Sequence, residues 1–161
     1  MIDEMEVLKS KTLLAFNDHR FPIDPFVIAT KEKINVFHAD FSFTDIFGII
    51  RKKQSGTFIY LSRYHQYPIQ RFMLAHLLGH YFLHQDRKKP ICAYCTNPFL
   101  DFQQSEEERE ADQFAMQMLL PADKIRKELK IPIQTDRIAD LFGVPLTILR
   151  QRIEQVKRDG K

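Results

Sequence analysis

The chain has 161 residues, a formal net charge of +3 and 44% hydrophobic residues, which fits one globular domain or one domain with a small appendage. It opens without the basic and apolar regions of a signal peptide and contains no apolar run near the roughly 20 residues of a membrane span. We therefore expect a cytoplasmic protein with no membrane segment. Its positive charges are scattered, which argues against nucleic acid as the main partner.

The N-terminal half predicts two helices and three strands. The helices are expected over residues 3–17 and 24–33, and the strands over residues 34–37, 48–53 and 57–63. Asp24 before Pro25 supplies an N-cap and a first-turn proline for the second helix. Gly56 supplies the turn between the last two strands, which are expected to form a hairpin.

The C-terminal half predicts helices. They are expected over residues 68–85, 105–120, 122–129, 136–142 and 145–156, with an irregular stretch between the first two. Ser105 and Glu108 have the spacing of a capping box, and Thr135 is expected to cap a later helix that Gly143 ends. The fold class predicted is α+β, rich in helices, with one small three-stranded sheet. We expect a main domain over residues 1–130 and a C-terminal helical segment over 131–161 packed on it.

The helix predicted over residues 68–85 carries a candidate metal-binding pair. His76 and His80 lie one turn apart, so their imidazoles face the same side of the helix. Zinc peptidases with the motif H-E-x-x-H use such a pair as metal ligands and the glutamate as general base. Leu77 stands at the position of that glutamate. Two histidines at this spacing also occur on ordinary helices, so the pair alone does not define a metal site.

A hydrolytic zinc site needs a third protein ligand besides its water. Glu108 is the candidate, because the next predicted helix can lie beside the first. Asp112, one turn further on, could accept a hydrogen bond from a zinc-bound histidine and set its tautomer. His84 is interpreted as a supporting or packing residue behind the ligands. Each acid also has a plainer interpretation, since Glu108 is the N3 residue of the capping box and Asp112 is a helix-surface acid.

The two cysteines form one C-x-x-C pair, Cys92 and Cys95, in the irregular stretch. Such a pair supplies only two ligands for a second metal ion, so loop cysteines are the preferred interpretation. A structural disulfide is not expected without secretion signals.

Two segments resemble the signatures of one family, the ImmA/IrrE zinc metallopeptidases. Residues 70–84 resemble its active-site helix, which reads like R-F-T-L-A-H-E-L-G-H-x-x-L-H. Residues 108–121 resemble its second signature, E-x-x-A-[ND]-x-F-A-x-x-L-L-x-P, with Met118 at the first leucine position. The resemblance covers nearly the whole chain and implies a zincin-like metallopeptidase domain with zinc as cofactor.

By position, the resemblance implies that the zinc ligands are His76, His80 and Glu108. Glu110 is the main competitor for the third place, but the spacing of the second signature favours Glu108. Family members in phages and other mobile genetic elements cleave a helix-turn-helix repressor, and others act in stress responses. The resemblance therefore implies a helix-turn-helix repressor or regulator protein as substrate or binding partner.

Leu77 predicts that hydrolysis is impaired. A leucine can neither take a proton from metal-bound water nor pass one to the leaving amine, and positioned acid–base groups contribute roughly 10²–10⁴-fold. The alternative function is a catalytically inactive relative that binds a repressor or regulator without cutting it. The leucine itself has two possible origins, natural divergence and engineered inactivation.

Residues 135–153 resemble a helix-turn-helix segment with Gly143 at the turn. The second helix would begin at residues 145–148, which are too apolar to read base edges, although Arg150 and Arg152 could touch phosphate. A DNA-binding regulator is thus the weaker alternative. The preferred interpretation is a module that covers one side of the peptidase domain or docks a repressor.

Overall fold

The computed structural model describes residues 21–42, 46–84 and 105–160. The helix expected over residues 3–17 and the pair Cys92 and Cys95 lie outside these ranges. Within them, every helix is too short or too polar to cross a lipid bilayer.

Helices and strands follow one another in the predicted order, and their ends fall within two residues of the predicted ones. In chain order they are α2 (Pro25–Lys31), β1 (Asn35–Ala39), β2 (Gly48–Lys53), β3 (Gly56–Ser62), α3 (Tyr67–Leu83), α4 (Glu106–Leu119), α5 (Ala122–Glu128), α6 (Thr135–Phe142) and α7 (Leu146–Arg158). The predicted α+β class, rich in helices with one small sheet, is confirmed. Asp24 caps α2 as expected, because its side chain accepts a hydrogen bond of 2.9 Å from the amide of Phe26.

The three strands form one mixed sheet in the order β1-β3-β2. β2 and β3 are the predicted antiparallel hairpin, and Gly56 adopts a φ of +132° at its turn, which glycine reaches without strain. β1 pairs in parallel with β3, so that Val36 lies opposite Ile59. The most apolar strand is therefore the central one.

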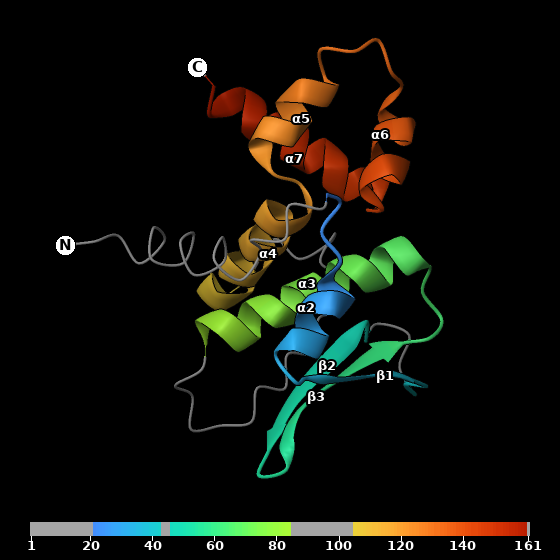
Figure 1. Cartoon of the computed structure of the whole chain (residues 1–161), viewed down its shortest axis with the longest axis vertical. Helices are drawn as coiled ribbons and strands as arrows, with labels where there is room; N and C mark the ends of the chain where they lie inside the picture. Colours follow the sequence, from blue (N-terminus) through green and yellow to red (C-terminus); the bar gives the residue numbers. More distant parts are fainter. Residues whose placement is uncertain (1–20, 43–45, 85–104, 161) are drawn as a thin grey trace, which may run out of the picture.

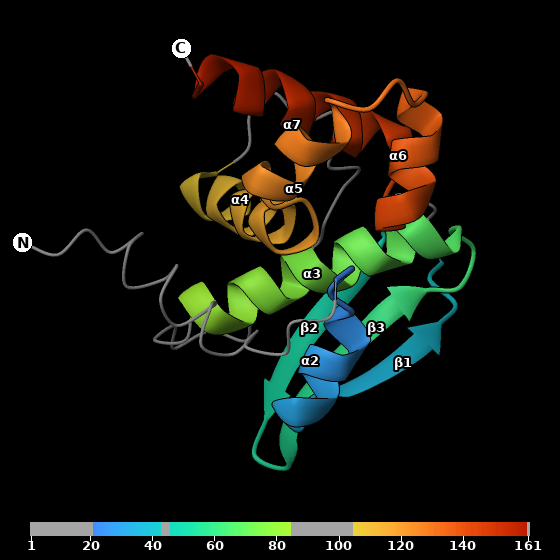
Figure 2. The same ribbon diagram turned by 45° about the horizontal axis from the view of Figure 1, so that its top comes forward.

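α3 lies between the sheet and the C-terminal helices, as Figures 1 and 2 show. Its residues from Arg71 to His80 are all buried, because the helix packs on β2 and β3 on one side and on α4 on another. A helix that is covered all round carries apolar side chains all round. Any polar side chain within this run therefore needs a partner inside the protein.

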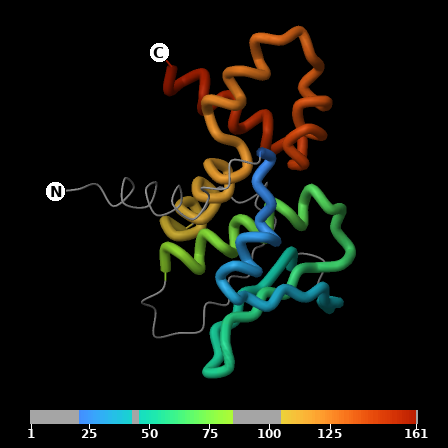
Figure 3. The backbone as a smooth tube through the Cα atoms, in the orientation of Figure 1, coloured from blue at the N-terminus to red at the C-terminus, as the bar shows by residue number. Residues whose placement is uncertain are grey.

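One such side chain, Arg71, connects α3 to the C-terminal helices. Its guanidinium donates to the carbonyl oxygens of Phe142 (2.6 Å), Gly143 (2.8 Å) and Ile23 (2.6 Å). Gly143 ends α6 in the left-handed conformation, with a φ of +61°. The tube in Figure 3 shows the segment before α2, in blue, starting beside the C-terminal helices, where the ring centroids of Phe21 and Phe142 lie 4.9 Å apart.

Two predicted helix starts in this region are wrong by one residue. The N-cap of α6 is Gln134, which has extended backbone angles, and Thr135 is already helical. Pro145 is the N-cap of α7 and not its first helical residue. Buried residues of α6 and α7 belong to the same hydrophobic core as α3. The domain boundary near residue 130 stays a prediction.

Candidate metal centre

Three predicted ligands from two helices meet at one point. His76 and His80 of α3 are 1% and 2% exposed, and their Nε2 atoms lie 3.1 Å apart. Glu108 in the first turn of α4 places Oε2 3.1 Å from Nε2 of His76 and Oε1 3.2 Å from Nε2 of His80. The ligand atoms of the three side chains all lie within 4.8 Å of one another, as a single metal ion would require.

α3 and α4 approach closely enough for this because small residues face each other. A Cβ atom on Gly79 would lie 3.0 Å from the Cα of Ala111 and 3.1 Å from its carbonyl oxygen. Gly79 was not among the residues singled out from the sequence. Its position between the two histidines on an otherwise covered helix was the available signal.

Glu108 has two roles that involve different atoms. Its backbone amide donates to the Oγ of Ser105 at 3.4 Å, which confirms the serine half of the predicted capping box. Its carboxylate lies beside the two histidines. The capping interaction therefore uses the backbone amide of Glu108, while its carboxylate remains available to the two histidines.

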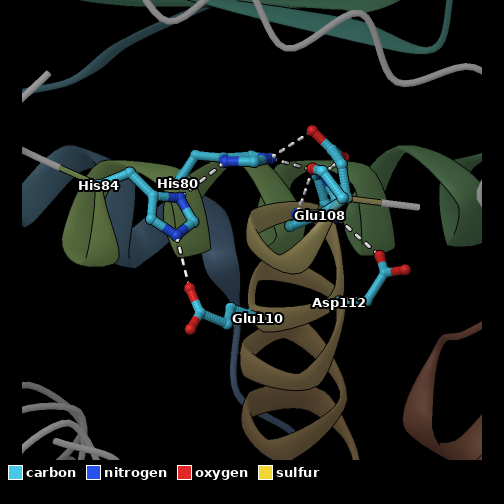
Figure 4. A network of polar contacts seen from close by, with 7 residues as sticks. His80, His84, Glu108, Glu110 and Asp112 are labelled. Carbon is cyan, nitrogen blue, oxygen red and sulfur yellow. Dashed lines mark hydrogen bonds and ion pairs between the residues drawn. The ribbon is translucent and has the colours of Figure 1, made fainter.

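Each histidine also has a polar partner on its other ring nitrogen. Nδ1 of His76 lies 2.7 Å from Oδ1 of Asp112, and Nδ1 of His80 lies 3.0 Å from Nδ1 of His84. Figure 4 shows these contacts pointing away from the point where the ligands meet. Asp112 and His84 thus lie behind the candidate ligands, and their supporting roles at a metal ion stay predictions. Glu110, the competitor of Glu108, is 2.9 Å from Nε2 of His84 and outside the group of three.

The chemistry of these donor atoms suits a cation. A carboxylate only accepts hydrogen bonds, so Asp112 requires the ring proton of His76 to lie on Nδ1. Nε2 of His76 then presents a lone pair toward the Glu108 carboxylate. Acceptors that converge at about 3 Å repel one another unless a proton or a metal ion lies between them. The residues present therefore fit zinc, which binds imidazole nitrogen and carboxylate oxygen.

Local electrostatics favour the protonation states that bind a metal. Burial lowers the pKa of His80, so its ring is neutral at pH 7. Burial alone would raise the pKa of Glu108, but His76 and His80, once acid protonates them, donate hydrogen bonds and carry positive charge, which outweigh burial and hold the pKa well below its usual range. A neutral imidazole and an ionised carboxylate are the forms that coordinate a metal.

Leu77 is fully buried and belongs to the hydrophobic core. A Cβ atom on Gly48 would lie 3.0 Å from its Cδ1, so the side chain packs against β2. Among the described acids of α4, Glu108, Glu110 and Asp112 each contact a histidine. The site thus combines a complete set of candidate ligands with an apolar residue where a proton acceptor is expected.

A mixed sheet, a covered helix with two histidines one turn apart and a carboxylate from the next helix define a metallopeptidase-like domain. The family model of the IrrE N-terminal-like domain, a peptidase family, matches residues 29–154. The chain therefore belongs to the ImmA/IrrE family, and the predicted resemblance is confirmed. A search of curated proteins found no match.

Proposed function

We propose that this chain is a zinc-binding member of its peptidase family in which peptide hydrolysis is impaired, and that it acts by binding a helix-turn-helix repressor or regulator protein. The observation that carries the proposal is the contrast within one turn of α3. His76 and His80 point with Glu108 to a common centre, while Leu77 lies fully buried between them in sequence.

A bound zinc ion would lower the pKa of its water and polarise a scissile carbonyl. The residues of this chain would hold that ion, and the hydrogen bond from His76 to Asp112 would keep Nε2 turned toward it. Leu77 offers no atom that takes or returns a proton. The missing acid–base group accounts for a loss of roughly 10²–10⁴-fold.

Support for the repressor or regulator partner comes from family membership alone. DNA binding through α7 is disfavoured by the surroundings of Arg152. Its Nε donates to the carbonyl oxygen of Leu120 at 3.0 Å, and its Nη1 donates to Gln155 at 3.1 Å. An arginine that ties α7 to the end of α4 is not displayed for contact with phosphate.

Metal binding is tested by elemental analysis of protein that has been stripped of metal, reloaded with zinc and dialysed. We expect one zinc per chain, and less than half an equivalent after Glu108→Gln. Glu106→Gln is the matched control, because Glu106 is exposed in the same turn and pairs with Arg109. Substoichiometric zinc in the reloaded wild type would contradict the proposal.

The role of Leu77 is tested with a fluorescently labelled helix-turn-helix repressor as substrate. Leu77→Glu is expected to raise the cleavage rate by about 10²–10⁴-fold. Leu77→Gln is the matched control, because glutamine is polar and has the size of glutamate, but its amide cannot act as a base. This variant should leave the rate low. Wild-type protein that cleaves as fast as Leu77→Glu would refute the impairment. Size-exclusion chromatography then shows whether the wild type holds the repressor intact.

A further inference from the structure

Behind His80, a second histidine and a carboxylate form a chain of contacts that joins α3 to α4. Nδ1 of His80 lies 3.0 Å from Nδ1 of His84, and Nε2 of His84 lies 2.9 Å from Oε2 of Glu110. Figure 4 shows the three side chains in this order, with Glu110 at the end remote from Glu108. We infer that His84 and Glu110 are positioning residues that orient His80 toward the metal. This inference rests on the proposed zinc site.

Helix geometry explains why two residues are needed here. His84 follows His80 by one turn, so the two rings lie along the same side of α3. Glu110 comes two residues after Glu108 and therefore points in a different direction from α4. Its carboxylate contacts the imidazole of His84, which in turn contacts His80. Asp112, in contrast, contacts Nδ1 of His76 directly.

The direction of each hydrogen bond in this series of side-chain contacts can be worked out from Glu110. Glu110 can only accept, so a neutral His84 carries its proton on Nε2 and offers a lone pair on Nδ1. Nδ1 of His80 must then be the donor in the contact of 3.0 Å. This leaves the lone pair of His80 on Nε2, the atom that lies 3.2 Å from the Glu108 carboxylate. The pair therefore selects the tautomer that can coordinate a metal through Nε2.

The exposure of His84 and Glu110 favours these hydrogen bonds. His84 is the C-cap residue of α3 and its side chain is only 9% exposed, so water competes little for its ring. Glu110 is 43% exposed, which allows its carboxylate to remain hydrated on one side while it accepts from His84. Groups that hold metal-bound histidines in this way commonly change metal affinity by roughly 10–100-fold when they are removed.

The test is the zinc dissociation constant, measured by competition with a chelator on folded full-length protein. His84→Leu removes the acceptor and should weaken binding roughly 10–100-fold. His84→Asn should restore most of the affinity, because the amide oxygen of asparagine can occupy the place of Nδ1. Glu110→Gln should give a smaller loss than His84→Leu, and adding it to His84→Leu should cause no further loss. Glu106→Gln should leave the constant unchanged.

A spectroscopic readout separates orientation from general stability. In zinc-loaded wild type, long-range proton–nitrogen NMR should show His80 bound through Nε2 with a slowly exchanging proton on Nδ1. His84→Leu should speed the exchange of that proton. Coordination through Nδ1 would overturn the inference. If His84→Leu does not fold, an unchanged zinc constant in the partly exposed Glu110→Leu variant, which leaves Nε2 of His84 without this acceptor, would overturn it as well.

The same measurements distinguish this inference from the proposed function. Wild-type protein that binds no zinc would overturn both. Wild-type protein that binds zinc, with unchanged affinity in His84→Leu, would overturn only the positioning role of His84 and Glu110.

Discussion

The close approach of α3 and α4 makes a sharp prediction for Gly79→Ala. In the interior of an ordinary helix this change stabilises a protein by about 1 kcal/mol, because glycine is a poor helix former. Here the new methyl group would lie 3.0 Å from the Cα of Ala111, 3.1 Å from its carbonyl oxygen and 3.3 Å from its Cβ. Two of these three atoms are backbone, so they can move only if α4 moves.

The sign of the effect follows from the two magnitudes. An extra carbon forced into a packed contact costs about 1–3 kcal/mol, which outweighs the gain in helix propensity. We expect a net loss of stability of about 1–2 kcal/mol, which corresponds to a fall in Tm of about 2–8 °C for a chain of this size. Because Glu108 lies one turn before Ala111, the displaced helix should also weaken zinc binding.

Thermal unfolding of metal-free protein and zinc titration measure the two effects separately. Gly160→Ala serves as the control, because a Cβ there would meet its nearest neighbour, the carbonyl oxygen of Val156, at an ordinary 3.4 Å. A Gly79→Ala variant that is more stable than wild type and binds zinc equally well would refute the close helix contact.

Four further predictions concern the link between α3 and α6 and the acid sensitivity of the site. Gly143→Ala should lower the free energy of unfolding by about 2–4 kcal/mol in urea, since its φ is +61° and its Cβ would overlap Nη1 of Arg71. Arg71→Met should cost on the order of 3 kcal/mol in the same assay, because three carbonyl groups, one of them in a buried contact, lose a charged donor; a loss below 1 kcal/mol would contradict this role. The lowered pKa of His80 means that the unfolded chain takes up protons first, so the Tm of metal-free protein should fall as the pH drops below about 6.5. The lowered pKa of Glu108 should add a second loss below about pH 4.5, which Glu108→Gln should remove.

The sequence predicted the local structure well because local signals lie within a few residues of the elements they define. Asp24 before Pro25 located the start of α2, and Ser105 located the start of α4. Two helix starts, at Thr135 and Pro145, were misplaced by one residue. At each of these starts, two adjacent residues can take the extended backbone conformation of an N-cap. No side chain makes a capping hydrogen bond that would distinguish them.

The candidate ligands were also predicted from the sequence, but their arrangement was not. The helical repeat alone places His76 and His80 on one face. The choice between Glu108 and Glu110 depends on how α4 is rotated against α3, and that rotation is set where Gly79 meets Ala111. The path from Glu110 through His84 follows from the same packing.

By itself, the sequence determined the helices, the strands, the family and the residue types available for chemistry, because a periodic pattern is written in neighbouring residues. Only the tertiary structure decided that β3 lies between β1 and β2, that Arg71 reaches three carbonyl groups, and that Glu110 contacts His84. These features depend on contacts between residues far apart in the chain. Such contacts are set by the shapes of packed surfaces and not by local periodicity.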